Sequence, residues 1–251
     1  MVRLTVITVT LNNSDSIEET INSVLSQSYR NIEYIIIDGG SADGTLDILE
    51  RYKDRIAVIV SGSDNGMYDA MNKGIALAGG DVVGILHADD IYAADDVLAQ
   101  VAAIFQSDDT DACYGDLIYT HKQDTSRITR FWKAGAYSSS KLYAGWMPPH
   151  PTFFVRRRCY TDYGVYRADM GTSADYELML RFLLRYHVTP VYLPRILVKM
   201  RSGGASNASL RCRLLAHLGD WQAWLLNGLC PLPWTVPLKP LRKLPQWFAK
   251  D

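Results

Sequence analysis

The stretch GGDVVGILHADDIY, residues 79–92, decides how this chain folds. Its centre, Val82 to Leu86, is a short apolar run typical of a parallel strand covered on both faces. Asp89 and Asp90 follow at its carboxyl end, where open α/β sheets bind ligands. Adjacent acids repel each other, so a hard divalent cation with oxygen ligands would compensate them. A second interpretation is a helix N-cap, because Asp90 or Asp95 could cap the segment that follows.

Before this stretch, the chain alternates apolar strands with amphipathic helices. Aliphatic and β-branched runs predict strands over residues 4–9, 32–37 and 58–60, and helical spacing predicts a helix in each interval. This order is the beginning of a doubly wound parallel sheet. The loops at the carboxyl ends of its first two strands carry Thr10 and Asp38.

Asp38 opens a polar turn that allows two interpretations. Aspartate in such a turn often binds its own backbone. An acid on the ligand side of a parallel sheet can instead accept hydrogen bonds from a base or a ribose. The chain contains neither GxGxxG nor GxxxxGK[ST], so the usual dinucleotide and P-loop interpretations have no motif to support them.

Length and charge bound the class of protein. The 251 residues fit one large domain or a domain with an appendage, and 48% hydrophobic residues allow a substantial core. The net charge of -1 gives no reason to expect a nucleic acid partner. Charge is uneven, however: residues 1–110 carry 6 Lys or Arg against 18 Asp or Glu, and residues 199–251 carry 8 against 2. A basic tail behind an acidic body favours an anionic surface beside the tail.

Cysteine usage and hydropathy predict a cytoplasmic protein. The four cysteines are scattered without a CxxC pair, which is typical of reduced thiols. The N-terminal residues are too polar for a signal peptide, and no run of about 18 apolar residues suggests a membrane-spanning helix.

The middle of the chain holds two candidate site residues. Three prolines in GWMPPHPTFFVRRR, residues 145–158, predict a rigid turn around His150, which is either a structural histidine or part of a site. Apolar spacing after residue 173 predicts a helix with Ser173 or Asp175 as its N-cap. Asp175 is thus either a cap, which contributes about 1 kcal/mol of stability, or a functional carboxylate.

Three ordered segments resemble glycosyltransferase family 2. They are VITVTLNN, QSYRNIEYIIIDGGSADGT and SDNGMYDAMNKGIALAGGDVVGILHADD, and the resemblance extends from about Leu4 to about Met200. It implies an inverting nucleotide-sugar transferase of the GT-A fold: a Rossmann-like nucleotide-binding half with a mostly parallel central sheet and helices on both faces. The expected division is a GT-A domain over residues 1–206, with a nucleotide-sugar half up to residue 110, and a C-terminal segment over residues 207–251.

The resemblance also assigns residues of the donor site. Nucleotide-sugar binding is assigned to Thr10, Asn12, Asp38, Asp64, Asn72, Lys73 and Asp89, and metal binding to Asp89 and Asp90. The segment from Asp64 to Lys73 is implied to close over the base and the phosphates. Without that context Lys73 is an exposed surface lysine. Mn²⁺ or Mg²⁺ is the expected cofactor, because a cation on the diphosphate stabilises the charge of the leaving nucleotide.

Two positions depart from the family pattern. Gly39 replaces a second acid that the family often has after the second strand, which affects base recognition. His87 replaces the first acid of the usual Asp-x-Asp, so the metal is expected to rest chiefly on Asp90 with support from Asp89.

In the acceptor half, the resemblance assigns roles to Asp175 and His150, and the glycine loop after the final strand suggests a third residue, Arg201. Asp175 matches the catalytic base, which an inverting transfer needs to take the proton of the acceptor hydroxyl. His150 matches a histidine near the acceptor cleft, and Arg201 is a candidate phosphate contact in this half. A Gln-x-x-Arg-Trp motif, found in processive members, is absent from the sequence, which favours transfer of a single sugar.

Beyond residue 207 the resemblance fades. An amphipathic helix with Trp221 and Trp224 is followed by a tail in which Trp234 and other aromatics alternate with Lys and Arg. This mixture suits a membrane interface, and the alternative is a tail packed on its own domain or on a dimer partner. Membrane contact would fit a lipid-linked acceptor on the cytoplasmic leaflet.

The sequence therefore predicts a hexosyltransferase that moves one sugar from a UDP- or GDP-sugar to a glycan or lipid-linked glycan in surface polysaccharide biosynthesis. Two alternatives stay open. A nucleotidyltransferase would share the metal-binding half, although the loop TLNNSDS is neither glycine-rich nor basic. A non-catalytic nucleotide or sugar binder would tolerate Gly39 and His87.

Overall fold

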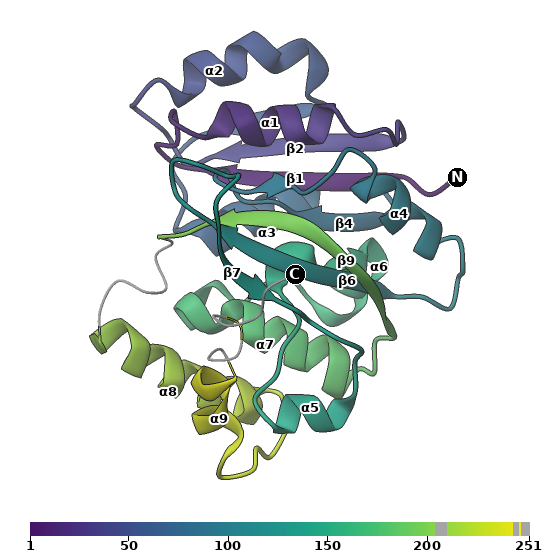
Figure 1. Ribbon diagram of the computed structural model, residues 1–251, viewed down its shortest axis with the longest axis vertical. Coiled ribbons are helices and arrows are strands. Elements are labelled where there is room, and N and C mark those ends of the chain that lie inside the picture. The colour runs from purple at the N-terminus through teal and green to yellow at the C-terminus, as the bar shows by residue number, and fades with distance from the viewer. Residues whose placement is uncertain (204–209, 243–245, 247–251) are drawn as a thin grey trace.

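The computed structural model describes residues 1–203, 210–242 and 246. The described strands form one mixed sheet in the order β3-β2-β1-β4-β8-β6-β9-β5, with β7 paired to β6 (Figure 1). The strands are β1 (Leu4–Thr10), β2 (Ile32–Asp38), β3 (Val58–Ser61), β4 (Val82–Ile85), β5 (Ile91–Tyr92), β6 (Ala112–Thr120), β7 (Ile128–Trp132), β8 (Phe154–Arg156) and β9 (Pro190–Arg201). The α-helices are α1 (Ile17–Leu25), α2 (Thr45–Tyr52), α3 (Met67–Leu77), α4 (Val97–Ile104), α5 (Ser139–Tyr143), α6 (Arg157–Tyr163), α7 (Ala174–Leu180), α8 (Leu210–Leu226) and α9 (Thr235–Leu241).

The first four strands along the sheet, β3-β2-β1-β4, are parallel, as the alternation of strands and helices predicts. Thr10 at the end of β1 pairs with Asp38 at the end of β2, so their carboxyl-end loops leave the sheet at one level. Strand β4 lies on the other side of β1 and ends at Ile85, just before the acidic pair. The topology therefore gathers the predicted donor residues at one edge.

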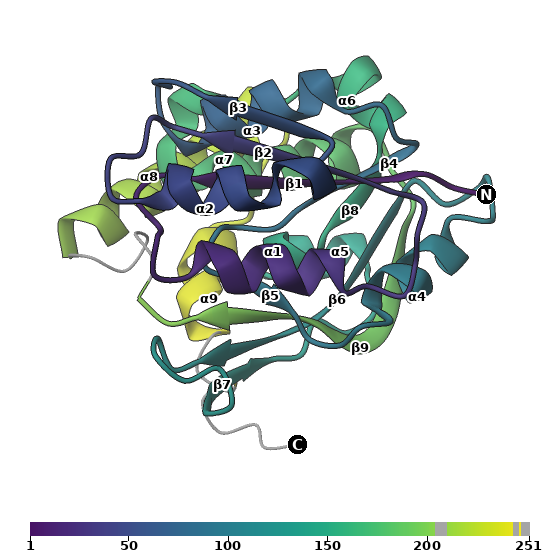
Figure 2. The ribbon, with the colours of Figure 1, turned by 90° about the horizontal axis from the view of Figure 1, so that it is seen from above.

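Helices α1 and α3 cover opposite faces of this parallel part (Figure 2). Because side chains alternate along a strand, Ile7 of β1 packs with the α3 side and Val6 with the α1 side. Gly74 allows α3 to approach the sheet closely, since a Cβ there would lie 2.5 Å from Cγ2 of Ile7.

Strand β8 joins the two halves of the sheet. Val155 of this strand pairs antiparallel with Val83 of β4 and with Ala112 of β6. Strand β9 then runs parallel to β6 and antiparallel to the short β5, where Ile91 pairs with Lys199. Strand β7 pairs antiparallel with β6, where Trp132 lies opposite Leu117, and so extends the sheet beside the main strand order.

The helix starts exclude one expected cap and decide between the alternatives for another, where Ser173 is confirmed. Helix α4 begins at Val97 with Asp96 at its N-cap, so neither Asp90 nor Asp95 caps it. Helix α7 begins at Ala174 with Ser173 at its N-cap, so Asp175 lies inside the first turn. The acids at the end of β4 are therefore not explained by helix capping.

The C-terminal helices pack on the acceptor half at the end of the molecule opposite α2 (Figure 1). Trp224 of α8 is completely buried and its ring contacts the tilted ring of Tyr143, whereas Trp221 on the other face is 39% exposed. Within the described ranges, no helix combines the length and apolar character needed to cross a membrane. Lys243, Trp247, Phe248 and Lys250 of the predicted membrane-facing tail lie outside the described residues.

Candidate active site

The carboxylate of Asp38 holds together the loops that follow β2 and β3. It is fully buried and accepts hydrogen bonds from the backbone N–H groups of Gly40 and Ser41, at 3.0 and 3.1 Å. It also accepts one from the hydroxyl of Ser61, at 2.6 Å. This geometry is the backbone-binding turn that the sequence allowed, and a direct contact of Asp38 with a nucleoside stays a prediction.

Asn12 ties the loop after β1 to the same turn. Its backbone is left-handed, with a φ of 53°, a conformation that asparagine tolerates better than most residues. The Oδ1 atom of Asn12 accepts a hydrogen bond from the N–H of Ala42 at 2.9 Å, and its own N–H donates to the hydroxyl of Ser41 at 2.7 Å. Thr10 and Asn12 thus belong to one surface built from the loops at the ends of β1 and β2, which we call the ledge.

Asp64 reaches this ledge from the loop before α3. One of its carboxylate oxygens accepts a hydrogen bond from the N–H of Gly66 at 2.9 Å. The other lies 2.8 Å from the point where Gly39 would carry a Cβ. Any side chain at position 39 would displace that carboxylate, so Gly39 makes room for Asp64. The acid missing from the turn after β2 is replaced in space by an acid from another loop.

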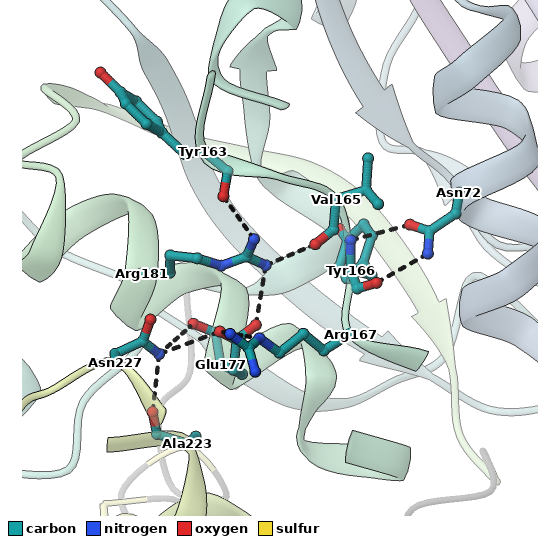
Figure 3. Close-up of polar contacts among 9 residues, drawn as sticks. All are labelled: Asn72, Tyr163, Val165, Tyr166, Arg167, Glu177, Arg181, Ala223 and Asn227. Atoms are coloured by element: carbon teal, nitrogen blue, oxygen red, sulfur yellow. Dashed lines mark hydrogen bonds and ion pairs between the residues drawn. The ribbon is translucent and has the colours of Figure 1, made fainter. Parts of the chain in front are cut away.

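Asn72 and Lys73, on α3, have protein partners. The side-chain amide of Asn72 exchanges two hydrogen bonds with the backbone of Tyr166, at 2.9 and 3.0 Å (Figure 3). Lys73 pairs with Asp69 at 3.1 Å and donates to the carbonyl of Ser63 at 3.3 Å. Asn72 therefore fastens α3 to the acceptor half, and the predicted phosphate contact of Lys73 would require it to change partners.

The acidic pair after β4 consists of one accessible and one buried carboxylate. Asp89 is partly exposed, whereas Asp90 is completely buried and neither of its carboxylate oxygens has a partner within the described residues. Burial and the charge of Asp89 raise the pKa of Asp90 well above its usual range, opposed by Arg201. Asp89 is thus the carboxylate that a ligand can reach in this structure, and the assignment of the metal chiefly to Asp90 stays a prediction.

The charge of Asp89 and Asp90 favours binding of a divalent cation. A buried carboxylate beside an accessible one is stabilised by positive charge, and Arg201 offsets only part of the cost of burying Asp90. In the part of the chain that the structure describes, no three His, Cys, Asp or Glu side chains are arranged to hold a metal ion. A cation here would take its remaining ligands from phosphate oxygens and water, as Mg²⁺ and Mn²⁺ do.

A second cluster surrounds Asp175. Its Oδ2 atom accepts a hydrogen bond from the hydroxyl of Tyr68 at 3.0 Å and lies 3.8 Å from Nδ1 of His150. The His150 ring meets that of His87 edge to face, with centroids 5.6 Å apart. The side chains of Asp175 and His150 stay 14% and 25% exposed, so the cluster opens to solvent. His87 stands two residues before Asp89, so this contact brings Asp175 next to the acidic end of β4.

Two pKa shifts define the protonation of this cluster. Burial and the charge of Asp175 raise the pKa of Tyr68, so its phenol stays protonated and donates to the carboxylate. Burial and the neighbouring His150 lower the pKa of His87, so its imidazole is neutral at pH 7. A carboxylate that faces solvent and is oriented by a phenol and an imidazole can accept a proton from a hydroxyl.

Arg201 is placed differently from the sequence-based expectation. Its buried guanidinium donates to the carbonyl of Lys122 at 2.9 Å and pairs with Glu19, and its charge acts on Asp90. The described contacts of Arg201 do not include His150 or Asp175, so it is not part of the acceptor-side cluster.

Tyr68 was missed from sequence, because its apolar position on α3 resembles an ordinary core contact.

Comparison with known proteins identifies the family. The model of glycosyl transferase family 2 matches residues 5–166, well over half of the chain. The chain belongs to glycosyltransferase family 2. As a family 2 enzyme it is a glycosyltransferase, and the match includes the ledge, α3 and the acidic pair. It ends before Asp175, so the base role of that residue is not covered by the family model.

Relatives with known names agree with this family. An uncharacterized glycosyltransferase of Mycobacterium tuberculosis is 35% identical over 184 residues, which cover 72% of this chain and 69% of the relative. A PGL/p-HBAD biosynthesis glycosyltransferase of Mycobacterium bovis BCG is 30% identical over 214 residues, which cover 83% and 81%.

Solved structures confirm the predicted GT-A fold of this family 2 glycosyltransferase. S. aureus TarS 1–349 in complex with UDP-GlcNAc has a TM-score of 0.68 at 17% identity, and the match covers 90% of this chain but 65% of TarS 1–349. Mannosyltransferase PcManGT from Pyrobaculum calidifontis, in complex with GDP-Man and Mn²⁺, has a TM-score of 0.67 at 19% identity, with coverage of 99% and 73%.

Proposed function

We propose that this glycosyltransferase moves one sugar from a UDP- or GDP-sugar to a hydroxyl of a glycan or lipid-linked glycan, with inversion at the anomeric carbon. One observation carries the proposal: the His87–His150 contact brings the partly exposed carboxylate of Asp175 next to the acidic end of β4. A base for the acceptor and an anchor for the donor diphosphate are thereby adjacent. The nucleotide sugars bound to TarS and PcManGT, and the Mn²⁺ of PcManGT, support the donor class and the cation.

In the proposed mechanism, Asp175 takes the proton of the acceptor hydroxyl as that oxygen attacks the sugar. Tyr68 and His150 orient the carboxylate during this step. Asp89 would hold Mn²⁺ or Mg²⁺, which when bound neutralises the charge that develops on the leaving nucleoside diphosphate. The ledge of Thr10, Asn12 and Asp64 would receive the nucleoside.

The proposal includes peripheral contact with the cytoplasmic face of a membrane, where a lipid-linked acceptor would be presented. Leu218, Trp221 and Leu225 share one face of α8 and are 68%, 39% and 60% exposed. Trp234, before α9, is 52% exposed, and the chain after residue 198 has an excess of 6 positive charges. Aromatic and aliphatic side chains beside basic residues suit an anionic lipid surface.

A donor panel tests the proposed activity. UDP-, GDP- and dTDP-sugars would be titrated by calorimetry with Mn²⁺ and with EDTA, and hydrolysis of the bound donors would be followed by release of the nucleoside diphosphate. We expect one UDP- or GDP-sugar to bind and to be hydrolysed slowly in a cation-dependent way. Failure of every nucleotide sugar to bind would overturn the proposal, and a nucleoside triphosphate that bound and lost pyrophosphate would favour a nucleotidyltransferase.

A further inference from the structure

The residues on both sides of Asp175 are held by the C-terminal helices. Ser173 donates from its hydroxyl to the carbonyl of Ala216 in α8, at 3.1 Å. Tyr176 accepts a hydrogen bond at its hydroxyl from the indole N–H of Trp224, at 3.0 Å. These contacts flank Asp175 along α7, although the helix that makes them, α8, comes much later in the chain.

Glu177 makes the third contact and is completely buried (Figure 3). Its carboxylate accepts a hydrogen bond from the side-chain amide of Asn227, just after α8, at 3.2 Å. It also pairs with Arg181 at 3.0 Å and with Arg167 at 3.4 Å. A buried carboxylate that loses one such partner is strongly destabilised, so this junction fixes α7 firmly against the end of α8.

Lys239 of α9 contacts both α8 and α7. Its ammonium group pairs with Asp220 of α8 at 2.7 Å and lies 3.6 Å from the centre of the Tyr176 ring. Both side chains of the pair are nearly buried, at 13% and 7% exposed. The second C-terminal helix is therefore fastened to the same turn of α7.

Gly219 shows how closely α8 approaches α7. A Cβ at this position would lie 2.6 Å from the Oγ atom of Ser173 and 3.0 Å from its Cβ. Rotation of the hydroxyl would relieve the first contact but not the second, because the Cβ is fixed to the backbone. A methyl group at position 219 would thus push α8 away from the start of α7 by a few tenths of an ångström.

We propose that α8 and α9 form a positioning element for the catalytic base, which fixes the first turn of α7 so that Asp175 points to the acceptor. The contacts at Ser173, Tyr176 and Glu177 lie on the side of this turn that faces α8 and the residue after it, and Asp175 lies on the side that holds Tyr68 and His150. This inference rests on the proposed role of Asp175 as base. It gives the C-terminal helices a part in the rate of transfer, in addition to any contact with a membrane.

Gly219→Ala tests the inference. Because a misplacement of about 1 Å can cost about 10²-fold in rate, a shift of a few tenths of an ångström is expected to lower kcat roughly tenfold. The donor Kd should stay within about twofold, since the described contacts of α8 are with the region before α7, with α7 and with α9, and not with the predicted donor residues. Gln222→Ala, on the exposed face of α8, is the control and should keep kcat.

Two further measurements separate positioning from general loss of stability. In an Asp175→Asn background, Gly219→Ala should cause no additional loss of transfer, because the group that it displaces is already absent. Asn227→Ala, which deletes one partner of Glu177 without adding bulk, should also lower kcat at constant donor Kd and serves if Gly219→Ala does not fold. Unchanged kcat per folded enzyme in Gly219→Ala and Asn227→Ala, or equal losses with and without Asp175, would overturn the inference. Full activity of Asp175→Asn alone would instead reject the proposed base.

Discussion

The hydroxyl of Tyr68 donates a hydrogen bond to Oδ2 of Asp175 over 3.0 Å and thereby joins α3 to α7. Tyr68 belongs to the same helix as Asn72, whose side chain binds the backbone of Tyr166. Helix α3 follows the loop of Asp64, so one short segment contacts both the nucleotide ledge and the proposed base. Binding of a donor could in this way influence the orientation of the group that activates the acceptor.

Tyr68→Phe is expected to lower kcat about tenfold, because a hydrogen bond to a charged group contributes about 1.5–3 kcal/mol. The ring would still fill its place in the core, so the melting temperature should change little. Tyr52→Phe removes a comparable hydrogen bond, which joins α2 to Glu18 of α1 over 2.9 Å and does not involve Asp175. This variant should leave kcat unchanged. Steady-state transfer rates of the two variants measure the effect of the Tyr68 hydroxyl on kcat. Equal kcat values for both variants would show that Tyr68 has only a packing role.

Asp175→Asn is expected to lower kcat roughly 10²–10⁴-fold, the usual contribution of a general base. The amide keeps the size of the side chain, so the fold and the donor Kd should survive. Transfer rate and donor affinity would be measured on the same preparation. A variant within about threefold of the wild-type kcat would reject the assignment, provided that chemistry limits the rate.

Asp89→Asn and Asp90→Asn form a matched pair that identifies the metal ligand. Because Asp89 is the accessible carboxylate, its replacement should abolish the EDTA-sensitive part of UDP or GDP binding, a loss of at least about tenfold in affinity. Asp90→Asn should retain most of that affinity. The reverse pattern would make the buried Asp90 the ligand, and EDTA-insensitive binding by the wild type would remove the metal role altogether.

Glu33 gives a prediction about pH and stability. Burial would raise the pKa of Glu33, but hydrogen bonds from Thr5 and Gly79 and the charge of Arg3 outweigh it, so the pKa is lowered from its usual 4.5. A lowered folded-state pKa means that the ionised carboxylate stabilises the fold above pH 4.5, and that this stabilisation is lost as the pH falls through the folded-state pKa.

Glu33→Gln should therefore lower the free energy of unfolding at pH 7, and the difference from wild type should shrink progressively below pH 4.5. Urea titrations between pH 3 and pH 7 would measure it. Glu50→Gln, which removes an exposed ion pair with Lys53, should change stability by less than about 1 kcal/mol at any pH. A deficit of Glu33→Gln that stayed constant with pH would contradict the assignment.

Replacement of Trp221 and Leu225 by serine tests the membrane contact. Both side chains are exposed on α8, so the fold should be kept while binding to vesicles that contain phosphatidylserine should fall severalfold. Leu77→Ser, which changes an exposed leucine on α3, is the control. Co-sedimentation measures the bound fraction, and equal sedimentation of all three proteins would indicate that the exposed face of α8 serves another purpose.

The strands and the general place of the site could be predicted because they depend on local patterns. Apolar runs such as Val82–Ile85 are strands, and the polar residues after them meet at one edge of the sheet because parallel strands end there. Asp175 and His150 were recognised as site candidates from a resemblance, and the structure brings them within 3.8 Å of each other.

What could not be predicted depends on partners distant in sequence. Nothing near Asp38 reveals that Ser61 would bind its carboxylate, and nothing near Tyr68 points to Asp175. The amphipathic pattern of α8 shows that one face is buried but does not say against what. The contacts with Tyr176 and Tyr143 explain why Trp224 is the tryptophan turned inward.

The pairing of β5 with β9 has a consequence for how the chain acquires its structure. Ile91 follows directly after the acidic pair, yet its strand partner is Lys199, near the end of β9, the last strand along the chain. The first 110 residues hold the predicted donor residues. Strand β5, however, has no strand partner until β9 has formed, and β4 keeps an open edge until β8 is added. An excised nucleotide half would expose that edge to other chains. We therefore expect the two halves to fold in one cooperative transition and, during synthesis, to complete the donor site only after β9 has left the ribosome.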